Sequence, residues 1–181
     1  MDKTELRRSL LQKRKSLTQQ EWQEKSDRIV SYLLASSLFN PGKTILAYFS
    51  CRREPDLNAL LHHNRHNWGL PRCVGENLAW HIWKPGDETQ VGAYGITEPL
   101  PTAPTISPSA VDFILVPAVA CDYRGYRLGY GGGYYDRLLS SPVWRSKPTI
   151  GIVFEFAYLP QLPIDPWDIP LHAVCTEEGL R

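Results

Sequence analysis

The chain has 181 residues, a length that suits one domain because hydrophobic cores seldom outgrow roughly 250–300 residues before a chain divides. Lys and Arg total 20 and Asp and Glu total 19, so the net charge of +1 predicts no global attraction to nucleic acid or to a membrane. The longest apolar run, residues 113–121, is far shorter than the roughly 20 residues that span a bilayer, and the first residues lack the apolar stretch of a signal peptide. We therefore expect a cytoplasmic monomer that forms one domain over residues 1–181, without nucleic-acid or membrane partners.

Cysteine and histidine spacing limits the metal and redox chemistry of the chain. The four cysteines are Cys51, Cys73, Cys121 and Cys175, and no two of them form a C-x-x-C pair, so neither a zinc site nor a redox motif is indicated. Each lies in or beside an apolar run, where a small buried thiol in a reducing compartment is the simpler interpretation. The five histidines show no metal-ligand pattern, and we expect them at the surface.

Two helices are predicted at the start of the chain. Asp2 and Glu5 have the spacing of a capping box, and so do Thr18 and Glu21. The first helix, over about residues 3–15, is strongly basic, with Lys3, Arg7, Arg8, Lys13, Arg14 and Lys15. The second has one apolar face, formed by Ile29, Val30, Leu33 and Leu34, and Pro41-Gly42 ends this unit.

Beyond residue 42 the pattern changes to strands that alternate with helices. Apolar runs at residues 44–49, 111–117 and 149–154 are typical of strands covered on both faces. Shorter strands are expected near residues 70–74, 78–84 and 173–176, helices over 55–66 and 134–140, and an extended proline-rich loop over 99–108. This alternation predicts an α/β fold with a mainly parallel sheet, in which ligands lie beyond the carboxyl ends of the strands.

A glycine-rich segment, residues 127–136, follows the strongest strand and carries four glycines in the five positions 129–133. Glycine lets backbone N–H groups approach an anion closely, and the helix that follows presents free N–H groups and the positive end of its dipole. Arg127 can add a bidentate contact to phosphate, and Asp136 can reach a magnesium ion. The segment is no Walker loop, because no Gly-Lys-Ser/Thr follows, and Tyr134 replaces the third glycine of a dinucleotide fingerprint. The spacing alone leaves open a plain glycine-rich turn whose Asp136 interacts with the helix dipole.

The surroundings of this segment resemble a known family. The run Phe113-Ile114-Leu115-Val116-Pro117-Ala118-Val119-Ala120-Cys121-Asp122 and then Gly125-Tyr126-Arg127-Leu128-Gly129-Tyr130-Gly131-Gly132-Gly133-Tyr134-Tyr135-Asp136-Arg137 closely resemble the 5-formyltetrahydrofolate cyclo-ligases, also called methenyltetrahydrofolate synthetases. Weaker marks follow the same order, namely Lys3-x-x-Leu6-Arg7, Tyr48-Phe49-Ser50 followed by Glu54, Tyr94-Gly95-Ile96-Thr97-Glu98-Pro99, and Trp167-Asp168-Ile169-Pro170.

The resemblance implies a three-layer α/β/α domain of the NagB/RpiA/CoA-transferase-like type. It also implies an enzyme that converts 5-formyltetrahydrofolate (folinate) to 5,10-methenyltetrahydrofolate with ATP and Mg²⁺, and releases ADP and phosphate. In the implied mechanism the formyl oxygen is phosphorylated and N10 then attacks the activated carbon. Such chemistry needs alignment and charge neutralisation more than a protein nucleophile.

The resemblance further assigns roles to residues of this chain. Arg127 and Tyr134 are the implied catalytic residues. The implied ATP-binding residues are Lys3, Arg7, Arg127, Leu128, Gly129, Tyr130, Gly131, Gly132, Gly133, Tyr134 and Tyr135. The implied substrate-binding residues are Arg7, Tyr48, Phe49, Glu54, Tyr94, Gly132 and Tyr134, and the implied magnesium ligands are Asp136 and Asp168.

The chain departs from the family pattern at two places. Some members carry basic residues where this chain has Tyr130 and Gly132, so we expect phosphate neutralisation to fall on Lys3, Arg7, Arg127 and magnesium. Many members are less basic at the positions of Arg52 and Arg53, just before Glu54. A hypothesis for these two arginines is contact with the anionic glutamate tail of folate.

Other interpretations stay open on the sequence. A sugar-phosphate or acyl-transfer enzyme on the same fold would hold a substrate phosphate at the glycine segment and turn over without ATP. A non-catalytic RNA-binding module would use the basic first helix, although the nearly neutral chain carries no recognisable RNA-binding signature. From spacing alone, Lys3 and Arg7 form a solvated helix face, Glu54 is exposed, Tyr48 and Phe49 are core residues, and Asp168 is a turn residue.

Overall fold

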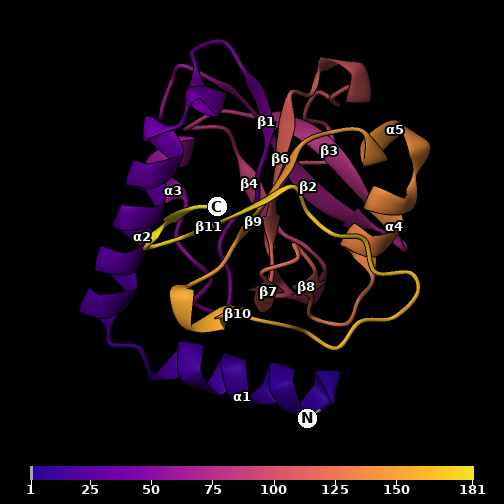
Figure 1. Ribbon diagram of the computed structural model, residues 1–181. Helices are drawn as coiled ribbons and strands as arrows, with labels where there is room; N and C mark the ends of the chain where they lie inside the picture. The colour runs from indigo at the N-terminus through magenta and orange to yellow at the C-terminus, as the bar shows by residue number, and fades with distance from the viewer. Residues whose placement is uncertain (1) are drawn as a thin grey trace.

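A seven-stranded sheet forms the centre of the computed structural model, which describes residues 2–181 (Figure 1). The strand order is β12-β11-β9-β6-β1-β2-β3. The inner strands β11 (Ala173–Thr176), β9 (Thr149–Ile152), β6 (Phe113–Pro117), β1 (Thr44–Leu46) and β2 (Asn67–Val74) are parallel. The edge strands β12 (Gly179–Leu180) and β3 (Asn77–Trp83) pair antiparallel with their neighbours. The prediction of a mainly parallel sheet is confirmed.

Helices cover both faces of this sheet, which confirms the three-layer α/β/α arrangement. In Figure 1, α2 (Gln19–Ala35) and α3 (Asn58–Leu61) lie on one side, and α4 (Tyr134–Ser140) and α5 (Pro142–Arg145) lie on the other. The predicted apolar face of α2 places Ile29, Val30 and Leu33 in the core that packs against the sheet. Short 3-10 segments occur at Ser37–Phe39, Ala93–Gly95, Pro108–Ala110 and Glu155–Ala157.

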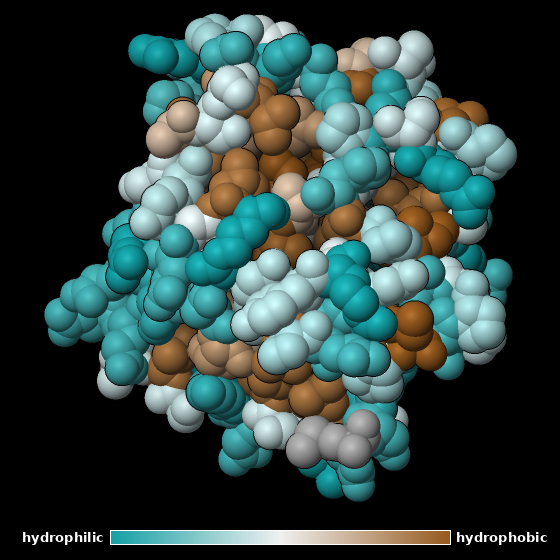
Figure 2. Space-filling view, viewed as in Figure 1, coloured by the Kyte–Doolittle hydropathy of each residue, from teal (hydrophilic) through white to brown (hydrophobic). Residues whose placement is uncertain are grey.

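Helix α1 (Lys3–Ser16) runs across one end of the sheet, below the strands in Figure 1. Its predicted capping box is present, because the Asp2 carboxylate accepts the backbone N–H groups of Thr4 and Glu5 while Glu5 accepts the N–H of Asp2. Hydrophilic side chains cover much of the outer surface of α2 in the same view, with apolar atoms visible deeper between the elements (Figure 2). No helix within residues 2–181 is both long and apolar enough to cross a membrane.

A second, small sheet lies between the main sheet and α1, and sequence patterns did not predict it (Figure 1). It consists of β10 (Tyr158–Leu159), β7 (Ala120–Asp122) and β8 (Arg127–Leu128) in that order. Since β7 follows β6 directly and β8 ends at Leu128, this sheet carries the chain from the carboxyl end of β6 to the glycine segment. A further hairpin, β4 (Thr89–Val91) and β5 (Thr97–Pro99), was also missed.

Three predicted elements are shorter than expected. The helix expected over residues 55–66 is confined to Asn58–Leu61, because β2 already begins at Asn67 and the chain must turn into that strand. The strands expected over residues 44–49 and 149–154 are also shorter, since their regular pairing with neighbouring strands ends at Leu46 and Ile152. The chain nevertheless stays buried past both ends, as the Ala47 N–H still bonds to the Gly69 carbonyl at 2.9 Å.

The expectation of surface histidines is wrong for two of the five. His66 is buried and packs edge-on against the rings of Phe39 and Trp68. His81 is buried in β3, where its Nδ1 lies 2.8 Å from the carbonyl oxygen of Ala103. Aromatic neighbours therefore surround the His66 ring, and a backbone carbonyl holds the His81 ring. Within residues 2–181, no group of three or more His, Cys, Asp or Glu side chains is gathered as a metal cluster.

A buried carboxylate at the end of β7 joins the small sheet to the C-terminal part of the chain. Asp122 is fully buried and accepts the backbone N–H groups of Arg124, Tyr126 and Leu162 at 2.9–3.0 Å. The guanidinium of Arg124 adds two contacts to the same carboxylate, at 3.0 and 2.7 Å. Asp122 therefore fixes both the turn before β8 and the segment that leads to Asp168.

We predict that Asp122→Asn lowers the free energy of unfolding by about 3–5 kcal/mol, the range for breaking one partner of a buried ion pair. An amide nitrogen at this place would face the Arg124 guanidinium or the Leu162 N–H, both of which are donors. The matched control is Asp112→Asn, since Asp112 is partly exposed and caps only the Thr44 N–H, with Lys43 beside it. Urea unfolding of the two variants measures the difference, and equal losses would contradict this role.

Candidate functional site

A cavity of about 580 Å³ lies where the carboxyl ends of the parallel strands meet α1 and the glycine segment. Every residue that the resemblance assigned to the site lines this cavity. Most of the lining comes from five stretches that are distant in sequence: the start of α1, residues 48–54, the β4–β5 hairpin, residues 127–136, and residues 165–168. Strands β2, β3 and β6 add Pro71, Cys73, Leu78 and Pro117. A volume of this size is typical of a small-molecule site.

The glycine segment forms one wall of the cavity and needs glycine at particular positions. Gly131 and Gly133 have φ values of 101° and 72°, which place them in the left-handed region that favours glycine. A Cβ atom at Gly129 would lie 2.7 Å from Nη1 of Arg127, so the segment passes this guanidinium in close contact. Gly133 precedes α4 with no side-chain cap, as predicted for a helix that presents free N–H groups.

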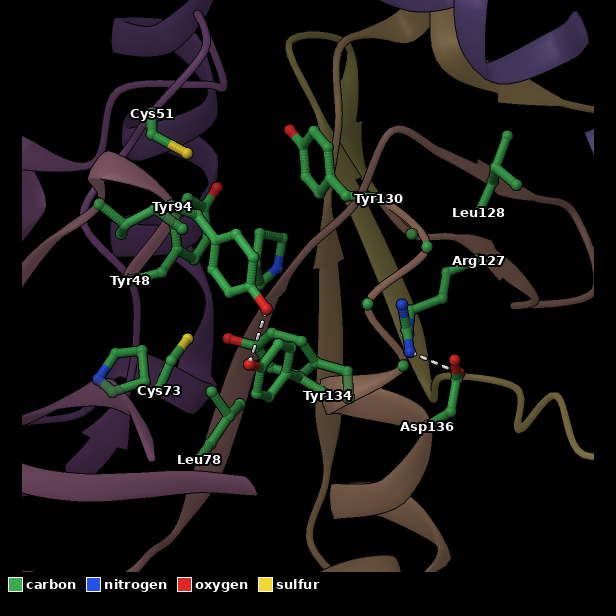
Figure 3. Close-up of a pocket in the computed structure, with 18 of the residues that line it drawn as sticks. Tyr48, Cys51, Cys73, Leu78, Tyr94, Arg127, Leu128, Tyr130, Tyr134 and Asp136 are labelled. Carbon is green, nitrogen blue, oxygen red and sulfur yellow. Dashed lines mark hydrogen bonds and ion pairs between the residues drawn. The ribbon is translucent and has the colours of Figure 1, made fainter. Parts of the chain in front are cut away.

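Arg127 and Asp136 form an ion pair across the ends of this segment. Nη2 of Arg127 lies 2.5 Å from Oδ1 of Asp136, as the dashed line on the right of Figure 3 marks. The Arg127 side chain is only 6% exposed, and its guanidinium packs over the ring of Tyr135. Among the described residues, the buried Nε of Arg127 has no hydrogen-bond partner. A nearly buried cation is thus presented to the cavity with an unused donor.

Lys3 and Arg7 of α1 line the cavity, so they do not form the solvated helix face that spacing alone suggested. Nζ of Lys3 lies 2.6 Å from Asp165 and 2.5 Å from Asp168. Burial lowers the pKa of Lys3, but the two aspartates outweigh that effect and the pKa is raised overall. Nε of Arg7 donates to the Gly129 carbonyl at 2.8 Å, so α1 is bonded directly to the glycine segment.

A buried network fixes the middle of the glycine segment. Nη1 of Arg14 donates to the Tyr130 hydroxyl at 2.5 Å, and that hydroxyl donates to Oε1 of Glu54 at 2.7 Å. Nη2 of Arg14 donates to the Ala118 carbonyl at 2.8 Å, and the Cys51 N–H donates to Oε2 of Glu54 at 3.0 Å. Arg14 and Glu54 are 2% and 3% exposed, so the interpretation of Glu54 as an exposed residue is wrong.

The Glu54 carboxyl is held in a low-polarity setting. Burial raises its pKa, while the hydrogen bonds from Tyr130 and Cys51 and the charge of Arg14 act in the opposite direction without cancelling the effect. Burial also raises the pKa of the Tyr130 hydroxyl, which therefore acts as a donor at neutral pH. The network can thus hold a proton between Tyr130 and Glu54 at the cavity wall.

Aromatic side chains form the wall opposite the glycine segment. Tyr48 is buried and Phe49 half-buried, with the Phe49 ring packed edge-on against Trp83 at 5.1 Å. Tyr48 therefore belongs to the core and to the cavity lining at once. Tyr94, at the tip of the β4–β5 hairpin, points toward Tyr134, and their hydroxyl oxygens lie 3.3 Å apart (Figure 3). The contact with Tyr94 and then burial raise the pKa of Tyr134 to about 12, so Tyr134 is a hydrogen-bond donor at neutral pH.

The carboxylates on the cavity wall are hard oxygen donors of the kind that Mg²⁺ prefers. Asp136 lies beside Arg127, and Asp168 accepts both Lys3 and the backbone N–H of Asp165. Residues 2–181 gather no cluster of three acidic side chains here, so the protein alone does not form a cage. This fits magnesium, which is usually held by one or two carboxylates together with substrate phosphates.

Sequence patterns missed several lining or supporting residues, and some left a signal. Lys3, Arg7, Leu10 and Arg14 follow the spacing of one helix face, so the burial of Arg14 could have been predicted from the two residues already assigned. Asp165 lies three residues before Asp168, on the same turn. Cys73 gave no signal, and Glu98 stood only within the family-like stretch 94–99 without a role, because the β2–β3 and β4–β5 pairings that bring them to the cavity were not foreseen.

The chain is similar along its length to proteins with a common name. A model of the 5-formyltetrahydrofolate cyclo-ligase family matches residues 1–177. The 5-formyltetrahydrofolate cyclo-ligase of Mycolicibacterium smegmatis is 32% identical over 194 residues, covering 98% of this chain and 95% of the relative.

Solved structures agree with this match. The NMR structure of Aquifex aeolicus 5,10-methenyltetrahydrofolate synthetase is similar with a TM-score of 0.88 and 36% identity, covering 100% of this chain and 92% of that chain. The structure of a 5,10-methenyltetrahydrofolate synthetase from Mycoplasma pneumoniae is similar with a TM-score of 0.77 and 27% identity. The match covers 98% of this chain and 99% of that chain. Cavity, fold and sequence point the same way, and the chain belongs to the 5-formyltetrahydrofolate cyclo-ligase family.

Proposed function

We propose that this enzyme converts 5-formyltetrahydrofolate to 5,10-methenyltetrahydrofolate with ATP and Mg²⁺. The observation that carries the proposal is the division of one cavity into a cationic, glycine-lined side and an aromatic side with a buried acid. A nucleotide triphosphate needs the first kind of surface, and a flat pterin with polar edges needs the second. Relatives named for this activity support the same assignment.

The cationic side would hold the phosphates of ATP. Arg127, Arg7 and Lys3 line it together with the backbone of residues 129–133. Arg127 offers an unused buried donor, and a phosphate oxygen would satisfy it with a charge-assisted hydrogen bond. Leu128 and Tyr135 line the same side, and the Arg127 guanidinium packs over the ring of Tyr135.

The aromatic side would hold the folate. Tyr48, Phe49 and Tyr94 supply faces on which the pterin or benzoyl ring can stack. Glu54 would accept hydrogen bonds from pterin N–H groups, and the buried Tyr48 hydroxyl, which lacks a partner among the described residues, is a further polar contact. Tyr134 and Gly132 also line the cavity and would lie where the formyl group and the terminal phosphate meet.

The proposed chemistry uses ATP to turn the formyl oxygen into a leaving group. The formyl oxygen attacks the γ-phosphorus and displaces ADP, N10 then attacks the formyl carbon, and the C–O bond breaks as phosphate departs and the N10 proton is released. Arg127 would stabilise the charge on the transferred group. Tyr134 would donate a hydrogen bond to the same group, in exchange for the one that its hydroxyl gives the Gly75 carbonyl at 2.9 Å. Magnesium would supply charge neutralisation on the phosphates, with Asp136 and Asp168 as its protein ligands.

We expect the purified protein to form methenyltetrahydrofolate from 5-formyltetrahydrofolate only when ATP and Mg²⁺ are both present. The absorbance of the product gives a direct assay, and omission of ATP or chelation of Mg²⁺ provides the controls. Turnover without ATP would favour a sugar-phosphate or acyl-transfer enzyme on this fold. RNA retention that depends on salt, with no turnover, would favour the RNA-binding alternative.

Removal of the Arg127 guanidinium is predicted to weaken the use of ATP more than the binding of folate. A hydrogen bond to a charged group contributes about 1.5–3 kcal/mol, so Arg127→Ala should raise the KM for ATP roughly 10- to 100-fold. Arg127→Lys should recover part of the loss, because it keeps the charge but not the planar fork. The matched control is Arg145→Ala on α5, outside the cavity. An unchanged KM for ATP in Arg127→Ala would remove Arg127 from the phosphate site.

The raised pKa of Glu54 predicts a pH dependence of stability with a definite sign. Because the folded protein binds the Glu54 proton more tightly than the unfolded chain, this proton stabilises the fold fully below the unfolded-state pKa. That contribution is lost as the pH rises through the folded-state pKa. The unfolding free energy of the wild type, relative to Glu54→Gln, should therefore fall as the pH rises above about 4, near the ordinary pKa of glutamate.

Urea unfolding at a series of pH values measures this difference. Glu24→Gln on the exposed surface of α2 is the control, because it removes the same charge without touching a buried site. A difference that grows with pH would mean that the carboxylate form of Glu54 is the one the fold prefers. In that case the hydrogen bonds from Tyr130 and Cys51 would outweigh burial.

A further inference from the structure

A tight turn just before Glu54 carries two arginines in an unfavourable backbone conformation. The Glu54 N–H bonds to the Cys51 carbonyl at 2.9 Å, and the two central residues, Arg52 and Arg53, have φ values of 48° and 57°. Positive φ at both central positions defines a type I′ turn, which is dominated by Gly, Asn and Asp. Bulky residues persist in such conformations only when their surroundings or their function require them.

Hydrogen bonds within the protein account for Arg53 but not for Arg52. Arg53 donates to the carbonyls of Leu17 and Thr18 at 2.8 and 3.1 Å, and its guanidinium lies over the ring of Trp22. Arg52 is exposed and has neither a hydrogen bond nor an ion pair of its side chain among the described residues. Its guanidinium lies over the ring of Tyr130, 5.4 Å from the centroid, and lines the cavity.

The position over Tyr130 places this guanidinium at the glycine segment. Tyr130 lies between Gly129 and Gly131, and its hydroxyl is fixed by Arg14 and Glu54. Two hydrogen bonds thus orient the Tyr130 ring, and a cation stacked on that ring lies at a defined place on the cavity wall. The strained turn and the Tyr130 ring together direct Arg52 toward whatever the glycine segment binds.

The cations that line the cavity differ in whether an acidic side chain of the protein already pairs with them. Lys3 and Arg127 already contact carboxylates, whereas Arg7 and Arg52 line the cavity without an acidic partner among residues 2–181. Arg7 is bonded to the segment itself through the Gly129 carbonyl. Arg52 is thus the lining cation whose guanidinium has all its donors free for a ligand.

We propose that Arg52 binds the phosphate groups of the nucleotide and acts as a second guanidinium beside Arg127. The inference rests on the proposed function only in that the glycine segment holds a triphosphate. This role differs from a contact of Arg52 with the glutamate tail of the folate. That tail is also anionic, but it belongs to the other substrate. Arg52 approaches from the turn at residues 51–54, so this loop and the glycine segment would close on the phosphates from two sides.

The test is the variant Arg52→Asn, since asparagine tolerates positive φ and removes the cation. Isothermal titration measures the Kd of a non-hydrolysable ATP analogue, of inorganic tripolyphosphate and of 5-formyltetrahydrofolate. We expect the Kd values of the ATP analogue and of tripolyphosphate each to rise about tenfold. The Kd of 5-formyltetrahydrofolate should stay within about twofold of the wild-type value. Arg52→Lys should recover part of the loss, and Arg65→Asn, an exposed arginine outside the cavity, controls for net charge.

Thermal unfolding without ligand separates ligand binding from a structural role. Asn at position 52 relieves backbone strain, so the unfolding temperature should equal or exceed that of the wild type while nucleotide binding weakens. A lower unfolding temperature would show that Arg52 holds the turn in place and would overturn the assignment. Loss of folate affinity with unchanged ATP affinity, or no change in either, would overturn it as well. A wild type that binds no ATP analogue would refute the proposed function itself.

Discussion

The structure depends on holding a segment with four glycines in five residues in one conformation. Glycine loses more conformational freedom on folding than any other residue, so such a segment would stay mobile without external contacts. The hydroxyl of Tyr130 provides the central contact, since it accepts from Arg14 of α1 and donates to Glu54 of the neighbouring loop. The bond from Arg7 to Gly129 and the ion pair of Arg127 with Asp136 fix the two ends. Side chains from outside the segment thus provide the rigidity that its own sequence lacks.

This arrangement also explains how a cavity rich in charge remains stable without its ligands. Isolated buried charges are costly, and here Lys3 contacts two aspartates while Arg127 contacts Asp136. A magnesium-bound triphosphate carries both an anion and a cation. In the proposed function the phosphates take over as partners of the basic residues while magnesium takes over as partner of Asp136 and Asp168. Binding would therefore exchange the charge partners of Arg127, Asp136 and Asp168, while Asp165, the more exposed of the two aspartates beside Lys3, would face solvent.

Local sequence signals predicted much of the fold, because their physical causes are local. The two capping boxes fixed the starts of α1 and α2, and continuous apolar runs marked the buried strands β1, β6 and β9. The family resemblance then named residues that all line one cavity. Periodicity alone placed Glu54 at the surface and Lys3 on a solvated helix face, since a pattern along one element does not reveal what packs against it.

The errors occurred where tertiary contacts decide. Strands of two or three residues, such as β8 and β10, are too short to show a period and form only because β7 lies between them. The helix expected over residues 55–66 ends at Leu61, because the parallel strand β2 must begin at Asn67 beside β1. His66 is buried because β2 brings Trp68 against its ring, and no sequence motif predicts this contact.

Backbone strain is concentrated at the same cavity. Within residues 2–181, the non-glycine residues with positive φ are Arg52, Arg53 and Tyr94. Arg52 and Tyr94 line the cavity, and Arg53 shares the turn of Arg52. Such conformations cost on the order of 1–3 kcal/mol each, a substantial part of the stability of a small protein. A fold under selection for stability alone would place Gly or Asn at these positions. The strain at the two lining residues instead positions a cation and an aromatic ring where the proposed nucleotide and folate would meet, so the protein gives up stability there for a preformed site.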